Sequence, residues 1–308
     1  MGDRAWMRIG TRGSPLALAQ AHETRRLLAH AHGMPEDRIE IVVIKVMGDQ
    51  IVDRALSEAG GKGLFTKEID LAQLAGEVDI AVHSSKDLPT VLPDGLEIAG
   101  YLTREDVRDV FISPRAKRLR DLPEGALVGT ASLRRQALVK KIRPDLRVGL
   151  LRGNVQTRLA KLESGECDAT LLALAGLKRL GLTDHATEIL SEEDFLPAVG
   201  QGAIGITVRS DDHQTHVRIG AILHPATNYA LTLERAYLRV LDGSCRTPIA
   251  GLAKVDGQHV SFRGMIMRSD GSEIYETRLS GSVEEAERLG VQAGQDLLSR
   301  APADILAH

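Results

Sequence analysis

The feature that most constrains the fold of this chain is the alternation of short apolar segments with amphipathic helical segments over its first two-thirds. The apolar segments have the length and composition of buried strands, and they are residues 7–10, 39–46, 78–82, 127–129, 147–151 and 169–173. Strands that alternate with helices are typical of parallel sheets that carry helices on both faces. A helix is predicted from Pro15 to about Ala31, with Ser14 as its N-cap and Pro15 at its first position. The sequence therefore predicts α/β architecture for this part of the chain.

Two connectors interrupt the alternation and divide the chain into predicted domains. They lie near residues 103–106 and 197–202. The apolar strand at 203–208 follows the second connector, so we expect it to return to the first domain and to make that domain discontinuous. Domain 1 is then residues 1–102 and 203–222, and domain 2 is residues 107–196.

From about residue 223 the pattern changes. A helix is predicted over 228–241 and a closing helix over 283–300, with strand-like segments between them at 249–255, 259–267 and 273–280. Short turns at Asp256-Gly257 and Asp270-Gly271 join these segments, which favours an antiparallel sheet. We predict a third, smaller α+β domain with a three-stranded antiparallel sheet over residues 223–308.

Composition excludes several classes of function. The 39 basic and 42 acidic residues give a net charge of −3, and aromatic residues make up 3% of the chain, so a nucleic-acid partner is not expected. No apolar run of 18 residues and no apolar signal core at the N-terminus are present, so we expect a cytoplasmic protein without a membrane segment. The two cysteines, Cys167 and Cys245, form neither a disulfide framework nor a zinc-ligand spacing, and no metal site is expected.

Cationic and helix-capping residues gather where the predicted strands end. Ligands of open α/β sheets bind beyond the carboxyl ends of the strands, where helix N-termini favour anions and arginine adds bidentate recognition. A single arginine on a helix is usually solvated, but here five separate strand ends carry such groups. We therefore predict a ligand with several negative charges. The residues concerned are Arg12, Ser14, Lys86, Ser132, Arg134, Arg135, Arg152 and Arg158, together with Lys178 and Arg179 after the strand at 169–173.

Asp87 and Cys245 differ from this cationic set. Asp87 is an acid among cations, and it is either a group that stabilises a cationic intermediate or a structural partner for Lys86. Cys245 lies in a turn between Gly243 and Pro248 with Arg246 beside it, and a nearby cation favours the thiolate. The local sequence alone leaves open whether this cysteine is a reactive group or a structural thiol.

Seven motifs, in order along nearly the whole chain, resemble those of the porphobilinogen deaminase family, also called hydroxymethylbilane synthases. They are Arg8–Gln20 (RIGTRGSPLALAQ), Gly61–Phe65 (GKGLF), His83–Pro89 (HSSKDLP), Gly129–Arg135 (GTASLRR), Leu151–Asn154 (LRGN), Gly200–Ala203 (GQGA) and Gly243–Pro248 (GSCRTP). The resemblance implies two α/β domains like those of type II periplasmic binding proteins, followed by the smaller third domain. It also implies a monomeric enzyme of tetrapyrrole biosynthesis.

The resemblance implies a specific chemistry. Cys245 would carry a dipyrromethane cofactor through a thioether, as a permanent anchor that does not turn over. The enzyme would join four porphobilinogen units with loss of ammonia at each step, and then release hydroxymethylbilane by hydrolysis. Asp87 would be the catalytic carboxylate that stabilises the cation left when ammonia departs.

The same resemblance implies roles for the other polar residues. Those matching cofactor contacts are Ser84, Lys86, Thr130, Ser132, Arg134, Arg135, Arg152 and Arg158; those matching substrate or elongation contacts are Arg12, Ser14, Gln20 and Arg179. Two positions depart from the family pattern, since Ser85 stands where many members have Met and Ala131 where many have Ser. His83 lies beside the site, and we expect it to have an orienting or structural role.

Two other hypotheses explain part of the sequence. A non-enzymatic anion-binding module explains the arginine-rich loops, but not the third domain with its cysteine. A cysteine hydrolase would use Cys245 as a nucleophile, but no histidine and Asn/Asp partners are identified for it.

Overall fold

The computed structural model describes residues 5–47, 66–243 and 247–306, and these residues fall into two compact units. The first unit contains residues 5–47, 66–104 and 203–228, and the second contains 105–202, 229–243 and 247–306. The prediction of three domains, with the second unit divided further into 107–196 and 223–308, stays a prediction.

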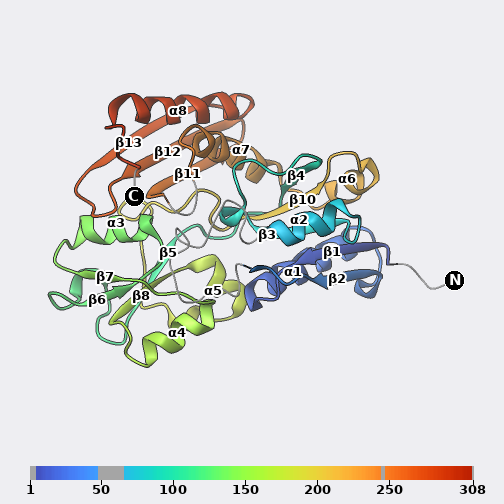
Figure 1. Ribbon diagram of the computed structural model, residues 1–308. Helices are drawn as coiled ribbons and strands as arrows, with labels where there is room; N and C mark the ends of the chain where they lie inside the picture. Colours follow the sequence, from blue (N-terminus) through green and yellow to red (C-terminus); the bar gives the residue numbers. More distant parts are fainter. Residues whose placement is uncertain (1–4, 48–65, 244–246, 307–308) are drawn as a thin grey trace. The chain divides into compact units, whose positions relative to one another are not determined.

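The first unit is built on a five-stranded sheet in the order β2-β1-β3-β10-β4 (Figure 1). Its strands are β1 (Met7–Thr11), β2 (Ile39–Val43), β3 (Ile80–Ser84), β4 (Leu96–Tyr101) and β10 (Ile204–Arg209). β1 runs parallel to both β2 and β3, whereas β10 is antiparallel to both β3 and β4. The expected return of strand 203–208 to the first sheet is confirmed, because Ile206 pairs with Val82 on one side.

The α/β fold class is confirmed, but both sheets are mixed rather than parallel as expected, because β10 and β5 run antiparallel to their neighbours. β10 enters the first sheet after the chain has left it and come back, so its direction is not fixed by a βαβ crossover. β4 was not predicted, and β2 ends at Val43 rather than continuing to Val46. Val46 is buried all the same, in a small cluster with Ile69 and Ala81, so its apolar character reflects packing rather than a strand.

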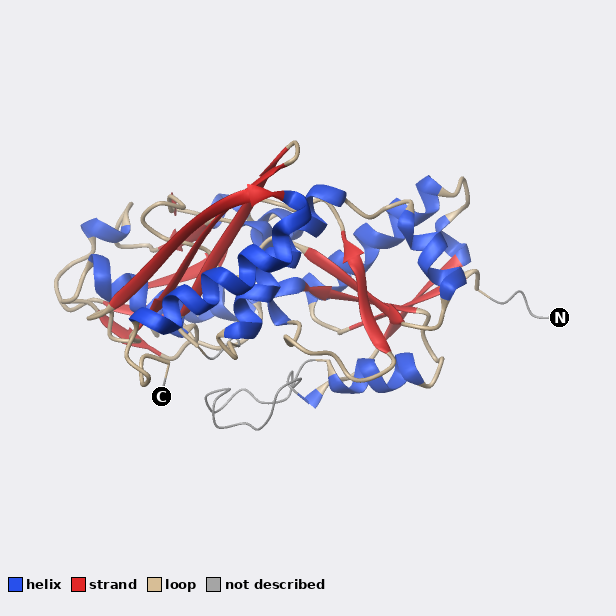
Figure 2. Cartoon of the chain, turned by 90° about the horizontal axis from the view of Figure 1, so that it is seen from above, coloured by secondary structure: helices blue, strands red, loops and turns tan. Residues whose placement is uncertain are grey.

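Helices flank this sheet (Figure 2). They are α1 (Pro15–Ala31), α2 (Lys67–Leu74) and α6 (His213–Gly220), while α7 (Pro225–Val240) begins in the first unit and continues into the second. Ser14 caps α1 as predicted, since its side chain accepts a hydrogen bond from the backbone N–H of Ala17.

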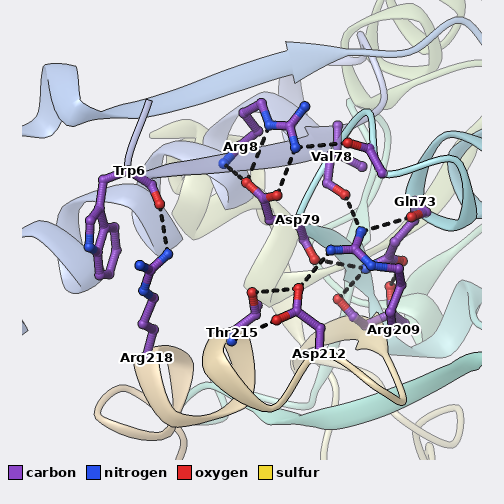
Figure 3. A network of polar contacts seen from close by, with 11 residues as sticks. Trp6, Arg8, Gln73, Val78, Asp79, Arg209, Asp212, Thr215 and Arg218 are labelled. Carbon is purple, nitrogen blue, oxygen red and sulfur yellow. Dashed lines mark hydrogen bonds and ion pairs between the residues drawn. The ribbon is translucent and has the colours of Figure 1, made fainter. Parts of the chain in front are cut away.

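The returning segment is held to the rest of the first unit by arginine contacts with backbone carbonyls (Figure 3). Arg209 donates from Nη1 to the carbonyls of Gln73 and Val78, each at 2.9 Å. Arg218 donates from Nη1 to the carbonyl of Trp6 at 3.0 Å, and its guanidinium carbon lies 4.7 Å from the centre of the indole ring. These contacts join segments that are far apart in the sequence.

The second unit contains a sheet in the order β7-β6-β8-β5-β9. Its strands are β5 (Asp109–Ile112), β6 (Leu127–Gly129), β7 (Arg147–Gly149), β8 (Ala169–Ala173) and β9 (Glu188–Ile189). β7, β6 and β8 are parallel, and β5 is antiparallel to β8 and β9. The helices that follow the parallel strands are α3 (Leu133–Ile142), α4 (Val155–Glu163) and α5 (Leu174–Leu180).

The predicted three-stranded antiparallel sheet is confirmed in the second unit. It consists of β11 (Ile249–Asp256), β12 (His259–Met267) and β13 (Ile274–Ser282), and α8 (Ala286–Arg300) packs against β13 and β12 (Figure 1). Short 3₁₀ turns complete the described elements, namely η1 (Glu36–Arg38), η3 (Ser85–Asp87), η4 (Leu119–Asp121), η5 (Thr183–His185) and η6 (Val283–Glu285). None of the helices in the described ranges has both the length and the apolar character needed to cross a membrane.

Candidate functional site

In the first unit, predicted site residues meet where β1 and β3 end. These strands are parallel neighbours, so their carboxyl ends lie at the same edge of the sheet. Arg12 follows β1 directly, and Ser14 accepts a hydrogen bond from the N–H of Ala17 at 3.3 Å as the cap of α1. Ser84 is the last residue of β3. The sheet therefore brings the β1 and β3 loops together, as the sequence predicts.

Gln20 and Ser84 are in direct contact. Gln20 Nε2 donates to Ser84 Oγ at 2.9 Å, and Ser84 Oγ donates to Gln20 Oε1 at 3.2 Å. Gln20 is 3% exposed, whereas Ser84 is partly exposed. The geometry shows Gln20 fixing the orientation of the serine hydroxyl from the buried side.

Lys86 and Asp87 follow β3 within the 3₁₀ turn Ser85–Asp87. Asp87 is exposed, and its carboxylate makes no hydrogen bond or ion pair with the described residues. The alternative that Asp87 is a structural partner for Lys86 therefore finds no support in the described contacts. The carboxylate oxygens of Asp87 are available to a ligand.

His83 lies beneath this turn in a buried polar network. Its Nε2 lies 3.4 Å from Thr207 Oγ1, which in turn donates to Gln73 Oε1 at 2.9 Å. Burial, and secondarily the charge of Arg12, lowers the pKa of His83 to about 4. His83 is therefore neutral near pH 7, which agrees with a structural rather than a catalytic role.

In the second unit, the end of β6 leads into the N-terminus of α3. Thr130 Oγ1 accepts from the N–H of Ser132 at 3.2 Å, and Ser132 Oγ accepts from the N–H of Arg135 at 3.4 Å. Ser132 is therefore the N-cap of α3, as predicted. The cap places Arg134 and Arg135 in the first turn of the helix.

Arg134 and Arg135 converge on one buried carboxylate, that of Asp109 at the start of β5. Arg135 donates to Asp109 Oδ1 from Nε at 3.1 Å and from Nη2 at 2.7 Å. Arg134 Nη1 lies 2.8 Å from Asp109 Oδ2. Arg134 is 3% exposed, Arg135 is 5% exposed and Asp109 is 0% exposed, so the cluster is buried. Two guanidinium groups and one carboxylate give it one more positive than negative charge.

The electrostatics of this cluster follow from its composition. Burial alone would raise the pKa of Asp109, but the two guanidinium groups outweigh that effect and hold it well below its usual range. Asp109 is therefore ionised. Burial lowers the pKa of Arg134, and the charge of Asp109 opposes that effect. Because arginine stays protonated in proteins, the cluster has one more positive than negative charge. A buried cationic cluster beside a helix N-terminus favours an anionic ligand.

The remaining predicted arginines lie at the ends of β7 and β8, the two parallel neighbours of β6. Arg152 follows β7 and is 9% exposed. Arg158 lies on α4 and donates from Nε to the carbonyl of Gly153 at 2.8 Å. Arg179 lies on α5, which follows β8, and donates from Nη2 to the carbonyl of Gly202 at 3.3 Å.

Sequence reasoning missed three buried polar residues of the second unit. Asp109 receives, besides the arginines, a hydrogen bond from Gln201 Nε2 at 3.2 Å. Glu234 accepts from the N–H groups of Gly200 at 2.7 Å and Ala253 at 2.8 Å. The sequence did contain a signal for Asp109, because this residue begins the apolar strand Asp109–Ile112. A carboxylate buried with such a strand almost always has a partner.

Two predictions lie outside the described residues. They are the cysteine Cys245 and the motif Gly61–Phe65. Cys167, the other cysteine, is a buried free thiol whose pKa is raised, mainly by burial. Among the residues that can be described, no group of three or more His, Cys, Asp or Glu side chains is placed to hold a metal ion.

Comparison with known proteins assigns the chain to a family. Residues 7–217 match the family model described as "Porphobilinogen deaminase, dipyromethane cofactor binding domain", and residues 229–299 match "Porphobilinogen deaminase, C-terminal domain". Two solved structures are similar to this chain at low sequence identity. A putative methionine-binding lipoprotein from Bacillus subtilis covers 70% of this chain and 87% of its own at 16% identity and a TM-score of 0.43. A periplasmic substrate-binding protein of an ABC transporter from Coxiella burnetii matches 72% of this chain and 93% of its own chain. Its sequence identity is 15% and its TM-score is 0.45.

Curated relatives match over nearly their whole length. A porphobilinogen deaminase from Nitrobacter winogradskyi is 60% identical over 293 residues, which is 95% of this chain and 93% of the relative. One from Nitrobacter hamburgensis is 58% identical over the same shares of both chains. With two family models covering most of its length and relatives at this level of identity, the chain belongs to the porphobilinogen deaminase family.

Proposed function

We propose that this chain joins four porphobilinogen units, with loss of ammonia at each step, and releases hydroxymethylbilane by hydrolysis. The observation that carries the proposal is the buried cluster of Arg134, Arg135 and Asp109, with its excess positive charge at the end of β6. Porphobilinogen and its oligomers carry acetate and propionate groups, so they are the multiply anionic ligands that such a cluster favours. The cluster lies within the matched cofactor-binding region.

The residues present fit dipyrromethane as the cofactor. Arg134 is buried, yet its Nε has no hydrogen-bond partner among the described residues, so a donor remains for a ligand carboxylate. The residues proposed to hold the cofactor are Ser84, Lys86, Thr130, Ser132, Arg134, Arg135, Arg152 and Arg158, with covalent attachment through Cys245. When bound, dipyrromethane supplies the pyrrole carbon to which the first porphobilinogen unit is joined.

Asp87 is proposed as the catalytic residue. Loss of ammonia leaves a positive charge on the substrate, and a carboxylate held near it stabilises that charge. Asp87 is exposed and unpaired within the described residues, so its oxygens can accept hydrogen bonds from pyrrole N–H groups. Its position directly after β3 places it on a short turn anchored by the sheet.

Arg12, Ser14, Gln20 and Arg179 are proposed to bind the incoming substrate. Arg12 and Ser14 follow β1, and Gln20 contributes by holding the Ser84 hydroxyl. Carboxylates of porphobilinogen are suited to the guanidinium of Arg12 and to the N-terminus of α1. We further propose that the enzyme is cytoplasmic and monomeric. Size-exclusion chromatography with light scattering would check that it is a monomer.

Intact-protein mass spectrometry and a porphobilinogen-consumption assay test this function. Purified protein should be heavier than its sequence by the mass of two linked pyrroles, and should give a coloured product with an aldehyde reagent for pyrroles. Cys245→Ser should lose both the added mass and the activity. Cys167→Ser is the matched control, because that thiol is buried, and should keep both. A bare sequence mass in active wild-type protein would contradict the covalent cofactor.

A further inference from the structure

A turn at residues 191–195 leads from β9 to two residues that contact Arg134. The turn is closed by a hydrogen bond from the N–H of Phe195 to the carbonyl of Ser191 at 2.9 Å. The ring centre of Phe195 lies 5.9 Å from the guanidinium carbon of Arg134, and Arg134 Nη1 donates to the carbonyl of Leu196 at 2.8 Å. The position of the turn therefore affects how this arginine is oriented.

The orientation of Arg134 depends on more than its ion pair. Its Nη1 lies 2.8 Å from Asp109 Oδ2. An ion pair through one nitrogen leaves the plane of the guanidinium free to rotate about that contact, whereas a carbonyl accepts along a preferred direction and an aromatic ring packs against a cation at its face. Leu196 and Phe195, both buried, therefore supply the directional contacts.

Arg263 on β12 holds the turn 191–195 to the three-stranded sheet. Its Nη1 donates to the carbonyls of Glu192 at 3.1 Å and Glu193 at 2.9 Å. Its Nε and Nη2 donate to the two carboxylate oxygens of Glu276 on β13, at 2.9 and 3.0 Å. The side chain is 14% exposed, and the bidentate pair with Glu276 fixes the plane of its guanidinium. Arg263 therefore presents a fixed donor to the backbone of the turn.

Arg278 on β13 allows a comparison within the same sheet, because it lies directly opposite Arg263. It contacts the same two glutamates, with Nε 2.7 Å from Glu276 Oε1 and Nη2 2.8 Å from Glu193 Oε1. Its side chain is 59% exposed, and within the described ranges its hydrogen bonds go to side chains only. The two arginines share their acidic partners, but Arg263 also holds the backbone of the turn.

We propose that Arg263 is a positioning residue for the proposed function, on which this inference rests. It fixes the turn 191–195 to the three-stranded sheet, and so holds Phe195 and the carbonyl of Leu196 against the guanidinium of Arg134. Arg263 acts through the turn rather than on the ligand. The three-stranded sheet thereby helps to order the proposed cofactor contacts at the N-terminus of α3.

Arg263→Gln and Arg278→Gln form a matched pair of variants, because each removes one guanidinium from the same two glutamates. Hydrogen exchange of the Phe195 amide, measured by NMR in a Cys245→Ser background, reports the opening of the turn without any covalent group. Arg263→Gln should speed this exchange roughly 10-fold or more, because the hydrogen bonds from a charged group that hold the turn are lost. Arg278→Gln should change it by less than about 5-fold, as expected for an exposed ion pair.

The second measurement is the rate at which folded molecules with Cys245 intact gain the added mass. Unloaded protein from cells that cannot make porphobilinogen is mixed with porphobilinogen, well below the melting temperature of every variant. Arg263→Gln should lower this loading rate at least roughly 10-fold, because misplacing a binding group by about 1 Å has effects of this size or larger. Arg278→Gln should load like wild type.

Gly257→Ala is the control for a loss of stability alone. It destabilises the same sheet at the turn between β11 and β12, and it should load like wild type. A role limited to stability would lower the loading of Gly257→Ala and Arg263→Gln alike. If Arg263→Gln does not fold, Arg263→Lys replaces it, because lysine keeps the charge but cannot hold Glu276 and the turn carbonyls together.

The outcomes separate this inference from the proposed function. If wild-type protein never gains the added mass, the proposed function fails, while exchange of the Phe195 amide still decides whether Arg263 fixes the turn. Equal exchange in Arg263→Gln and Arg278→Gln overturns the inference whatever the chain binds. Faster exchange with wild-type loading in Arg263→Gln overturns the positioning role.

Discussion

The side chains of Gln20 and Ser84 exchange two hydrogen bonds, with Gln20 Nε2 and Oε1 lying 2.9 and 3.2 Å from Ser84 Oγ. This contact links α1 to the end of β3 within the first unit. It gives Gln20 a role that its position in the sequence does not reveal. The glutamine acts on the proposed site by fixing a hydroxyl that lies one residue before the Ser85–Asp87 turn.

The Gln20–Ser84 contact predicts coupled effects on stability. Gln20→Leu should lower the free energy of unfolding by roughly 1–3 kcal/mol, because it leaves the Ser84 hydroxyl without its partner. Gln20→Leu combined with Ser84→Ala should cost less than the sum of the single variants. Urea unfolding followed by the fluorescence of the single tryptophan, Trp6, measures all three proteins. Strictly additive losses would show that the two side chains do not depend on each other.

Replacing Asp87 should separate cofactor loading from turnover. Asp87→Asn keeps the size of the side chain and removes the charge that stabilises the cationic substrate, so the turnover rate should fall by about 10²–10³-fold. The added mass on Cys245 should persist in most molecules. Asp94→Asn, at another exposed aspartate of the first unit, is the control and should match wild type. Wild-type turnover in Asp87→Asn would refute the catalytic role.

His83 predicts how stability depends on pH. Burial and the charge of Arg12 lower the pKa of His83 from 6.5 to about 4, so between these values the unfolded chain binds a proton that the folded chain does not. Stability should therefore fall as the pH falls through this window, by about 3 kcal/mol for this group near its lower end.

His83→Gln should remove that component of the pH dependence. The control is His22→Gln, at an exposed histidine on α1, which should keep the wild-type profile. Urea midpoints at a series of pH values between neutral and about pH 4 measure the effect. Identical profiles for His83→Gln and wild type would mean that the histidine is not held neutral.

Replacement of two turn glycines of the three-stranded sheet by alanine should lower the free energy of unfolding by different amounts. Gly257 has φ +58° and no atom within 4 Å of an added Cβ, whereas Gly271 has φ +75° and its Cβ would lie 2.7 Å from the carbonyl oxygen of Ala137. Gly257→Ala should lower the free energy of unfolding by about 1 kcal/mol, because alanine disfavours the left-handed backbone conformation.

Gly271→Ala should cost roughly 1–3 kcal/mol more than Gly257→Ala, because the added methyl meets backbone atoms of α3 that cannot move aside cheaply. Chemical denaturation of both variants measures the difference. Equal costs would mean that the turn between β12 and β13 does not pack tightly against α3.

The sequence predicted those features that depend on local chemistry. Ser14 and Pro15 mark the start of α1 to the residue, and Ser132 marks the start of α3, because caps and first-turn residues act within a few positions. The alternation of apolar and amphipathic segments also predicted the two α/β sheets, and the short turns after residue 223 predicted the separate antiparallel sheet. The strand-end placement of the arginines followed from the same alternation.

The sequence did not predict features that depend on distant partners. The directions of β10 and β5 depend on how the chain returns to each sheet, which periodicity does not record. The pairing of Asp109 with Arg134 and Arg135 joins residues more than 20 positions apart. The two neighbouring arginines share this carboxylate but contact different backbone carbonyls, that of Leu196 for Arg134 and that of Leu171 for Arg135.

The position of β10 between β3 and β4 has a consequence for synthesis of the chain on the ribosome. The sheet of the first unit lacks its fourth strand in spatial order until Arg209 has been made, whereas the sheet β7-β6-β8-β5-β9 is complete at Ile189. The sheet of the first unit, which begins the chain, is therefore completed after the α/β sheet of the second unit. This order differs from the usual one, in which the N-terminal domain folds first. Until then β3 and β4 present unpaired backbone edges, which β10 covers by pairing with both strands. The fully buried side chains of Ile204, Ile206 and Val208 are also missing from the core until that point. A nascent chain stalled before β10 would be exposed to aggregation at that gap.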